Sequence, residues 1–154
     1  MRPGRLRGLT PGEQALGAEM FGAALDAGRV RLFAAPLWRR AFVAGPALMV
    51  WPAKHVRDDF AAPQVPLRVQ AVFVHELTHV WQAQNGINLL IAKLRAGDDA
   101  RAYAYDLAGG PDFARLNIEQ QAMVVEHAFL ARRGGSSPFA ADDYAAVLPH
   151  WTRS

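Results

Sequence analysis

The stretch HELTHVWQ, residues His75 to Gln82, brings two imidazoles and a carboxylate together within five positions. Residues four apart on an α-helix differ by about 40° around its axis, so His75 and His79 project side by side. Two imidazole nitrogens at that spacing can reach one metal ion about 2 Å from each. Glu76 lies about 100° round from His75, where it can approach a water on the same ion and act as a general base. The pattern therefore predicts two metal ligands and one base in a single helical turn.

The surroundings of this motif strengthen the prediction. The segment VFVHELTHVW is strongly apolar, and burying two imidazoles and a carboxylate there costs several kcal/mol unless something compensates. A divalent ion compensates directly. The alternative is an ordinary buried helix whose two histidines are hydrogen-bonded to core carbonyls.

A third ligand is expected, because a catalytic zinc keeps three protein ligands and one open position. The extended pattern H-E-x-x-H-x-x-G-x-x-H is excluded, since Gln82 and Asn85 stand where its Gly and His would be. Glu119 is the leading candidate, because it falls in the first turn of a predicted helix, beside a core-facing apolar stripe. The helix dipole alone would also favour a carboxylate there, and Asp106 and Glu126 remain the main alternatives. The full set of downstream candidates is Asp98, Asp99, Asp106, Asp112, Glu119, Glu126, His127 and His150.

The elements around the motif predict an α+β, mostly helical fold in one domain over residues 11–154, after a flexible basic tail at 1–10. Capping-box patterns begin helices at Thr10 and Asn117. Pro46 and Pro52 bracket a strand that they mark as an edge strand, able to pair with an extended peptide through its main chain. The expected helices span 11–27, 67–85, 87–96, 118–133 and a short stretch after 140; the expected strands span 30–33 and 47–51.

Composition narrows the function classes. The chain has 154 residues, a net charge of +3 and no cysteine, so thiolate metal sites are excluded. The arginines are scattered and not clustered on one face, which does not favour nucleic-acid binding. No apolar run approaches a membrane span of about 20 residues, and the basic start lacks the apolar core of a secretory signal. We expect a cytoplasmic protein, or one exported by a route that needs no N-terminal signal peptide.

With its downstream YAYDL and NIEQQA, the HELTHVWQ block resembles the gluzincins, in which HExxH is followed by a glutamate on a second helix. It is more closely similar to small bacterial metallopeptidases related to Vgr and Rhs secretion proteins, over roughly residues 28–130. The resemblance implies a compact zincin-like domain with a small β-sheet packed on the active-site helix, and Zn²⁺ on His75, His79 and Glu119. Larger gluzincins carry a carboxylate four residues after the ligand glutamate, where this chain has Met123. Asp106 or Glu126 could supply that carboxylate as a hydrogen-bond partner for a ligand histidine.

The function expected from these features is zinc-dependent hydrolysis of peptide bonds, with Glu76 as general base to a zinc-activated water. Tyr103 and Tyr105 could each place a phenol near the metal to stabilise an oxyanion, or could simply fill interhelical contacts. The expected partner is a peptide or protein substrate, with no nucleic acid and no membrane. The alternative is a non-catalytic zinc-binding scaffold or adaptor associated with a secretion or injection system.

Overall fold

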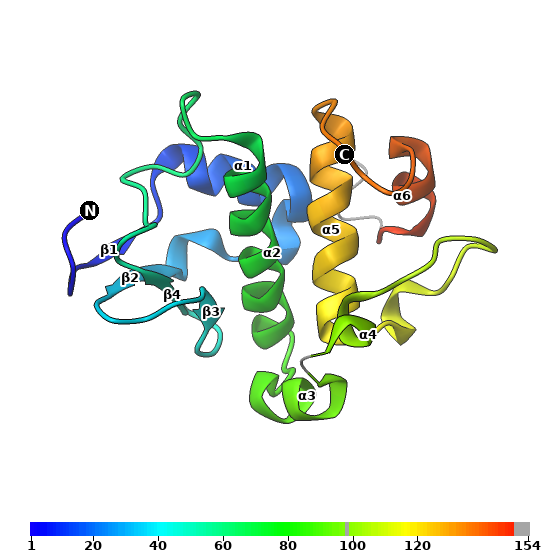
Figure 1. The fold of residues 1–154 in the computed structure, drawn as a ribbon, viewed down its shortest axis with the longest axis horizontal. Coiled ribbons are helices and arrows are strands. Elements are labelled where there is room, and N and C mark those ends of the chain that lie inside the picture. Colours follow the sequence, from blue (N-terminus) through cyan, green and yellow to red (C-terminus); the bar gives the residue numbers. More distant parts are fainter. Residues whose placement is uncertain (98, 150–154) are drawn as a thin grey trace.

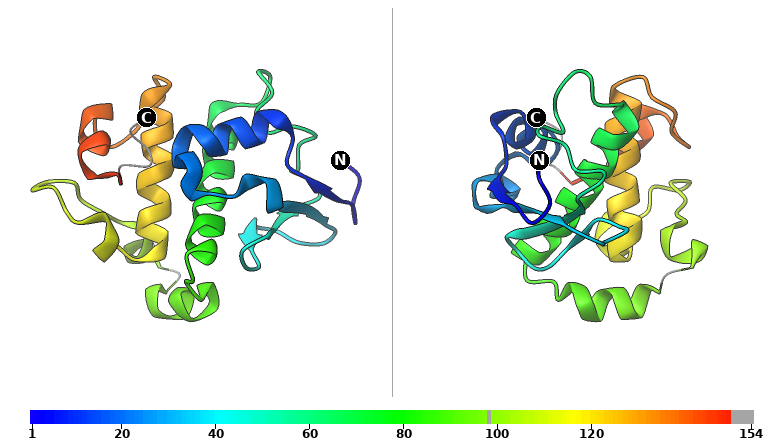
Figure 2. Two further views of the ribbon diagram at one scale, coloured as in Figure 1. Left: turned by 180° about the vertical axis from the view of Figure 1, so that it is seen from behind. Right: turned by 60° about the vertical axis from the view of Figure 1, so that its left-hand side comes forward.

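Two long helices, α2 (Leu67–Gln84) and α5 (Ile118–Arg132), lie side by side at the centre of the molecule (Figures 1 and 2). The computed structural model describes residues 1–97 and 99–149. A small sheet and α1 (Pro11–Phe21) pack on one side of this pair, and α6 (Ala141–Val147) packs on α5 from the other. Two short helices, α3 (Leu89–Ala96) and α4 (Ala100–Tyr103), connect α2 to the segment before α5. The predicted α+β, mostly helical fold class is confirmed.

The sheet has four strands in the order β1-β2-β4-β3: β1 (Leu6–Gly8), β2 (Arg31–Ala35), β3 (Phe42–Val43) and β4 (Leu48–Pro52). β2 and β4 are parallel, and the outer pairings are antiparallel. The prediction that 47–51 forms an edge strand is wrong, because β4 lies between β2 and β3. Pro46 precedes the strand and Pro52 is its last residue, so neither proline removes a hydrogen bond from the strand's interior.

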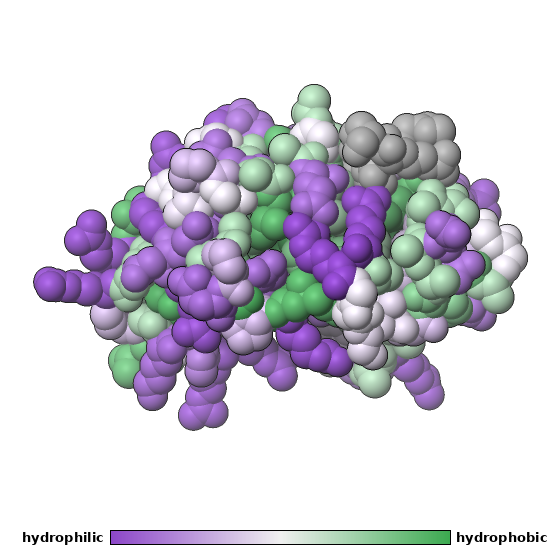
Figure 3. All heavy atoms as spheres, turned by 90° about the horizontal axis from the view of Figure 1, so that it is seen from above, coloured by the Kyte–Doolittle hydropathy of each residue, from purple (hydrophilic) through white to green (hydrophobic). Residues whose placement is uncertain are grey.

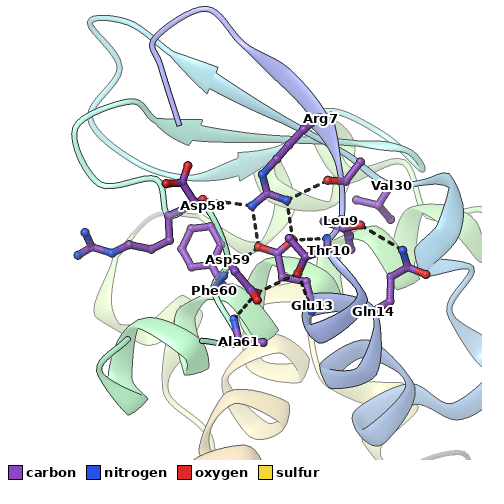
Figure 4. A network of polar contacts seen from close by, with 12 residues as sticks. Arg7, Leu9, Thr10, Glu13, Gln14, Val30, Asp58, Asp59, Phe60 and Ala61 are labelled. Atoms are coloured by element: carbon purple, nitrogen blue, oxygen red, sulfur yellow. Dashed lines mark hydrogen bonds and ion pairs between the residues drawn. The ribbon is translucent and has the colours of Figure 1, made fainter. Parts of the chain in front are cut away.

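The first ten residues are not simply a flexible tail. Leu6–Gly8 pairs with Arg31–Phe33 as β1, and the Arg7 guanidinium donates to both carboxylate oxygens of Glu13 at 2.6 and 2.7 Å. Glu13 is fully buried and also accepts from the backbone N–H groups of Thr10 and Phe60 (Figure 4). This buried ion pair, which we call the Arg7–Glu13 clasp, fixes β1 to α1 and to the loop that precedes α2.

Helix α1 begins where the capping box predicts and ends earlier than expected. The Thr10 hydroxyl accepts from Glu13 N, and the Glu13 carboxylate accepts from Thr10 N. The chain leaves the helix at Gly22, whose φ of 53° suits glycine, and not at Gly28. Two 3₁₀ turns, Gly22–Ala24 and Ala27–Arg29, then lead into β2.

The middle of α2 is buried on every side. Residues 73–80 are all buried, because the sheet and α1 cover one side of the helix and α5 covers the other. A ring cluster joins β4 and the following loop to this segment, with Phe60 centred 4.4 Å from Trp51 and 4.8 Å from Phe73. The helix ends at Gln84, and Gly86 takes a positive φ of 85° just beyond it. The motif His75 to His79 therefore lies within a continuously buried stretch of α2.

The surface is uneven in character. Large exposed apolar side chains are carried by α3 and by the loop between β2 and β3: Leu90, Leu94, Leu37 and Trp38. Figure 3 shows the end of the molecule away from α3, where long hydrophilic side chains project and apolar residues lie between them. Within the described part of the chain, no helix is both long enough and apolar enough to cross a membrane.

Candidate metal centre

Two imidazoles one turn apart on α2 form the first part of the candidate site. The ring centroids of His75 and His79 are 5.0 Å apart and the rings are nearly perpendicular. Each Nδ1 has a partner: Glu126 Oε2 lies 3.0 Å from that of His75, and Gln82 Oε1 lies 2.8 Å from that of His79. When the rings are neutral and these partners accept the Nδ1 protons, each Nε2 atom keeps a lone pair for a metal.

Glu119 enters the same space from the first turn of α5. An asparagine capping box, Asn117 with Gln120, begins this helix as the sequence predicts. The carboxylate is buried, and its Oε2 lies 3.4 Å from Nε2 of His75 and 3.4 Å from Nε2 of His79. Two donor atoms on one tetrahedral zinc stand about 3.3 Å apart, given bonds of about 2 Å. The three residues offer ligand atoms within 4.8 Å of one another, and this spacing fits a single ion.

Glu76 is the fourth member of the group and differs from the others in its bonding. It is 7% exposed, and its Oε2 is buried with no hydrogen-bond partner among the described residues. Burial raises the pKa of its carboxyl, and the neighbouring histidines only partly offset this effect. A buried carboxylate oxygen without a donor is costly, and this one belongs to a residue that lines the same cavity as the candidate ligands.

The pKa values of His75 and Glu119 are shifted by the charged groups that lie close together in the cluster. Burial disfavours the protonated ring of His75, yet hydrogen bonds to Glu119 and Glu126 outweigh burial and raise its pKa to about 9. Burial alone would raise the pKa of Glu119, but its bonds to His75 and His79 hold that pKa far below the usual range. The acidic groups thus attract a positive charge into this space, which a proton on His75 or a metal cation can supply.

A cavity of about 600 Å³ opens onto the cluster. Its walls combine His75, Glu76, His79 and Glu119 with apolar side chains from α2, α3 and β3. The edge strand beside it is β3, so any main-chain pairing of an extended peptide would use Phe42–Val43 and not the predicted strand at 47–51. The site is therefore reachable from solvent, although its polar groups are buried.

The two tyrosines proposed as oxyanion donors lie in different places. Tyr103 lines the cavity, and its hydroxyl accepts a hydrogen bond from Lys93 Nζ at 3.2 Å. Tyr105 is not among the described residues that line the cavity. Its hydroxyl is bonded to Nδ1 of His127 and to the hydroxyl of Tyr144, and burial followed by the Tyr144 bond raises its pKa. The position of Tyr105 corrects the expectation of a metal-side role and matches the alternative, an interhelical contact.

The other candidate third ligands have separate roles where the structure describes them. Glu126 is the partner of His75 and does not join the ligand group. The side chains of Asp99, Asp106 and Asp112 cap nearby backbone N–H groups, and His127 is bonded to Tyr105. Asp98 and His150 lie outside the described residues.

Lys93 is the site residue that sequence reasoning missed. Its Nζ donates to Oε1 of Glu119 and to the hydroxyl of Tyr103. Burial alone would lower the pKa of Lys93, but the bonds to Glu119 and Tyr103 outweigh it and raise that pKa. The only signal in the sequence is its position on the short helix expected at 87–96, directly after the motif helix. That signal does not say which face of the helix meets the cavity.

Comparison with known proteins adds two relatives, while no protein-family model matches the sequence. The chain is 31% identical over 155 residues to the type VI secretion system spike protein VgrG2b of Pseudomonas aeruginosa, a match that covers 94% of this chain and 15% of that protein. The chain thus spans only a small part of the spike protein's length. The solved effector domain of Pseudomonas aeruginosa VgrG2b superposes with a TM-score of 0.71 and 31% identity, over 93% of this chain and 84% of that domain. Because sequence and fold agree over most of this chain and most of that domain, this chain belongs to the family of the VgrG2b effector domain.

Proposed function

We propose that this domain is a zinc-dependent metallopeptidase that works as an effector of a type VI secretion system. The observation that carries the enzymatic part is the meeting of His75, His79 and Glu119 at one point, with the unpartnered Oε2 of Glu76 beside them. The secretion part is supported by the family, since the relatives are a type VI spike protein and its effector domain.

The donor set suits zinc. Two neutral imidazoles and one carboxylate are the ligands of known catalytic zinc sites, which keep one position open. Bound there, zinc would polarise a substrate carbonyl and lower the pKa of a water molecule. The bonds from Glu126 to His75 and from Gln82 to His79 hold the two rings so that Nε2 of each faces the shared point.

The chain's own acid–base chemistry would be carried by Glu76. Glu76 lines the cavity, so its carboxylate would accept a proton from a water molecule there and hand it to the nitrogen of the departing amine. Burial raises the pKa of this carboxyl, which makes it a stronger proton acceptor. Tyr103 lines the same cavity and can donate its phenolic hydrogen to a developing oxyanion.

Metal analysis of the purified protein tests the ligand set. We expect about one zinc per wild-type chain, and loss of zinc in His79→Ala and in Glu119→Ala. Asp106→Ala is the matched control, since this exposed carboxylate accepts from the backbone N–H of Ala108; the variant should keep its zinc. Full zinc occupancy in Glu119→Ala would exclude Glu119 as the third ligand.

Peptide hydrolysis tests the base. Glu76→Gln keeps the size and burial of the side chain, so this variant should retain zinc and lose cleavage of an unstructured protein substrate by at least about 100-fold. Unchanged cleavage would remove Glu76 from the mechanism.

A second candidate function is a zinc-binding scaffold or adaptor of the secretion machinery that turns over nothing. The match to a type VI spike protein favours it, because a spike component can use a metal for stability alone. The same experiments separate the two proposals: a scaffold would bind zinc through His75, His79 and Glu119, but would cleave nothing, and Glu76→Gln would change none of its properties.

A further inference from the structure

Each of the three proposed ligands has one polar partner on the atom that faces away from their meeting point. Glu126 is the hydrogen-bond partner of Nδ1 of His75, and Gln82 is the partner of Nδ1 of His79. The third partner is Lys93, whose Nζ donates to Oε1 of Glu119. Partners of this kind set the orientation of metal ligands and are nearly as important to a site as the ligands themselves.

The two carboxylate oxygens of Glu119 face different partners, and Lys93 binds one of them. Oε2 lies 3.4 Å from both Nε2 atoms, whereas Oε1 is turned toward α3 and the ammonium group. The Glu119 side chain is 2% exposed, so Oε1 has little access to water and needs a donor from the protein. Carboxylates can bind a cation through one oxygen or through both, and the position of Lys93 favours one.

Lys93 is itself held in place. Its Nζ donates to the hydroxyl of Tyr103 at 3.2 Å and stands 5.6 Å from the centre of that ring. Helix α3 has no fully buried residue, and its partly buried Leu89 packs against the core. The bond from Lys93 to Glu119 also joins α3 to α5 beside the cavity.

From this arrangement we infer that Lys93 is a positioning residue, which restricts Glu119 to one ligand oxygen and so keeps a coordination position open for water and substrate. The inference rests on the proposed function, because it assumes that His75, His79 and Glu119 bind a metal. If an apolar side chain replaced Lys93, the buried Oε1 would lose its donor, and the nearest positive charge left to it would be the metal. The carboxylate would then rotate to bind through both oxygens and fill the open position.

Substitution of cobalt(II) for zinc tests this directly, because four-coordinate cobalt absorbs visible light much more strongly than cobalt with more ligands. Four proteins are compared: wild type, Lys93→Met, Lys93→Arg and Arg95→Met. Arg95 lies on the same helix and is exposed, so its variant controls for the loss of one positive charge. Arginine at position 93 can still donate to Oε1 and should preserve the wild-type state.

We expect strong absorption from wild type, Lys93→Arg and Arg95→Met, and weak absorption from Lys93→Met at equal cobalt content. With zinc, Lys93→Met should retain the metal and hydrolyse peptide about 10-fold to 100-fold more slowly. A Lys93→Met spectrum identical to that of wild type would overturn the inference, as would loss of metal from this variant, because a restricted carboxylate is not needed for binding. Failure of the proposed function looks different: the wild-type protein itself would take up no cobalt or would keep it after Glu119→Ala.

Discussion

Replacement of Arg7 by methionine should destabilise the whole domain, although Arg7 lies in a stretch whose sequence resembles a loose tail. Methionine keeps most of the aliphatic length of arginine and removes the guanidinium. The change leaves the fully buried carboxylate of Glu13 with two of its four donors, the backbone N–H groups of Thr10 at 2.8 Å and Phe60 at 2.9 Å.

The size of the effect follows from burial. Removing one partner of a buried ion pair costs about 3–5 kcal/mol, because the remaining charge loses its compensation. Arg7 is 21% exposed along its side chain and two donors to Glu13 remain, so the lower end of this range applies, about 3 kcal/mol. For a domain of this length that loss lowers the melting temperature by roughly 6–12 °C.

Urea denaturation followed by circular dichroism measures the free energy of unfolding, with calorimetry for the melting temperature. Arg5→Met is the matched control, because Arg5 is exposed and lies two residues before Arg7, just outside β1; it should change stability by less than about 0.5 kcal/mol. In a Glu13→Gln background the Arg7 change should cost less, since no buried charge is left uncompensated. If Arg7→Met lies within 1 kcal/mol of wild type, the Arg7–Glu13 clasp is not a stabilising contact.

Three further outcomes are expected. Gln82→Leu removes the acceptor that orients His79, so zinc affinity measured against a competing chelator should fall about 10-fold to 100-fold, while a variant that binds as tightly as wild type would show that the amide does not orient the ring. The pKa of His75 is raised from an ordinary 6.5 to about 9. Protonation of His75 should therefore stabilise the metal-free protein by about 3 kcal/mol below pH 6.5, and this stabilisation should be lost as the pH rises through about 9. The melting temperature of the wild type should fall as the pH is raised across this range, and an equal fall in His75→Gln would assign the effect to other groups. Tyr105→Phe should cost about 1 kcal/mol of stability, from its lost hydrogen bonds, and leave peptide cleavage unchanged, whereas Tyr103→Phe should slow cleavage; slower cleavage in Tyr105→Phe would return that residue to the mechanism.

Local signals in the sequence predicted the parts of the fold that depend on neighbouring residues. The capping boxes at Thr10 and Asn117 begin α1 and α5 where expected, because their hydrogen bonds join residues only three apart. The side-by-side placement of His75 and His79 follows from helix geometry alone. The apolar stripe on the second helix was enough to turn Glu119 inward, to the point where the two imidazoles face it.

Features set by contacts between distant segments were harder to predict. Whether β4 is an inner or an outer strand depends on where β3 folds back, and the prolines around β4 carry no information about that. The roles of Arg7 and Lys93 depend on single buried carboxylates in other elements, so neither residue differs in sequence from an ordinary surface cation. Tyr103 and Tyr105 are two residues apart on a segment of mostly irregular backbone, where sequence spacing does not fix the direction of a side chain.

The order of the strands bears on how this domain behaves at high concentration. The two inner strands are five residues long, while the outermost ones, β1 and β3, have three and two. An outer strand exposes unpaired backbone groups to which other chains can add, and short outer strands limit that risk. A sheet whose outer strands are its shortest therefore offers little template for aggregation.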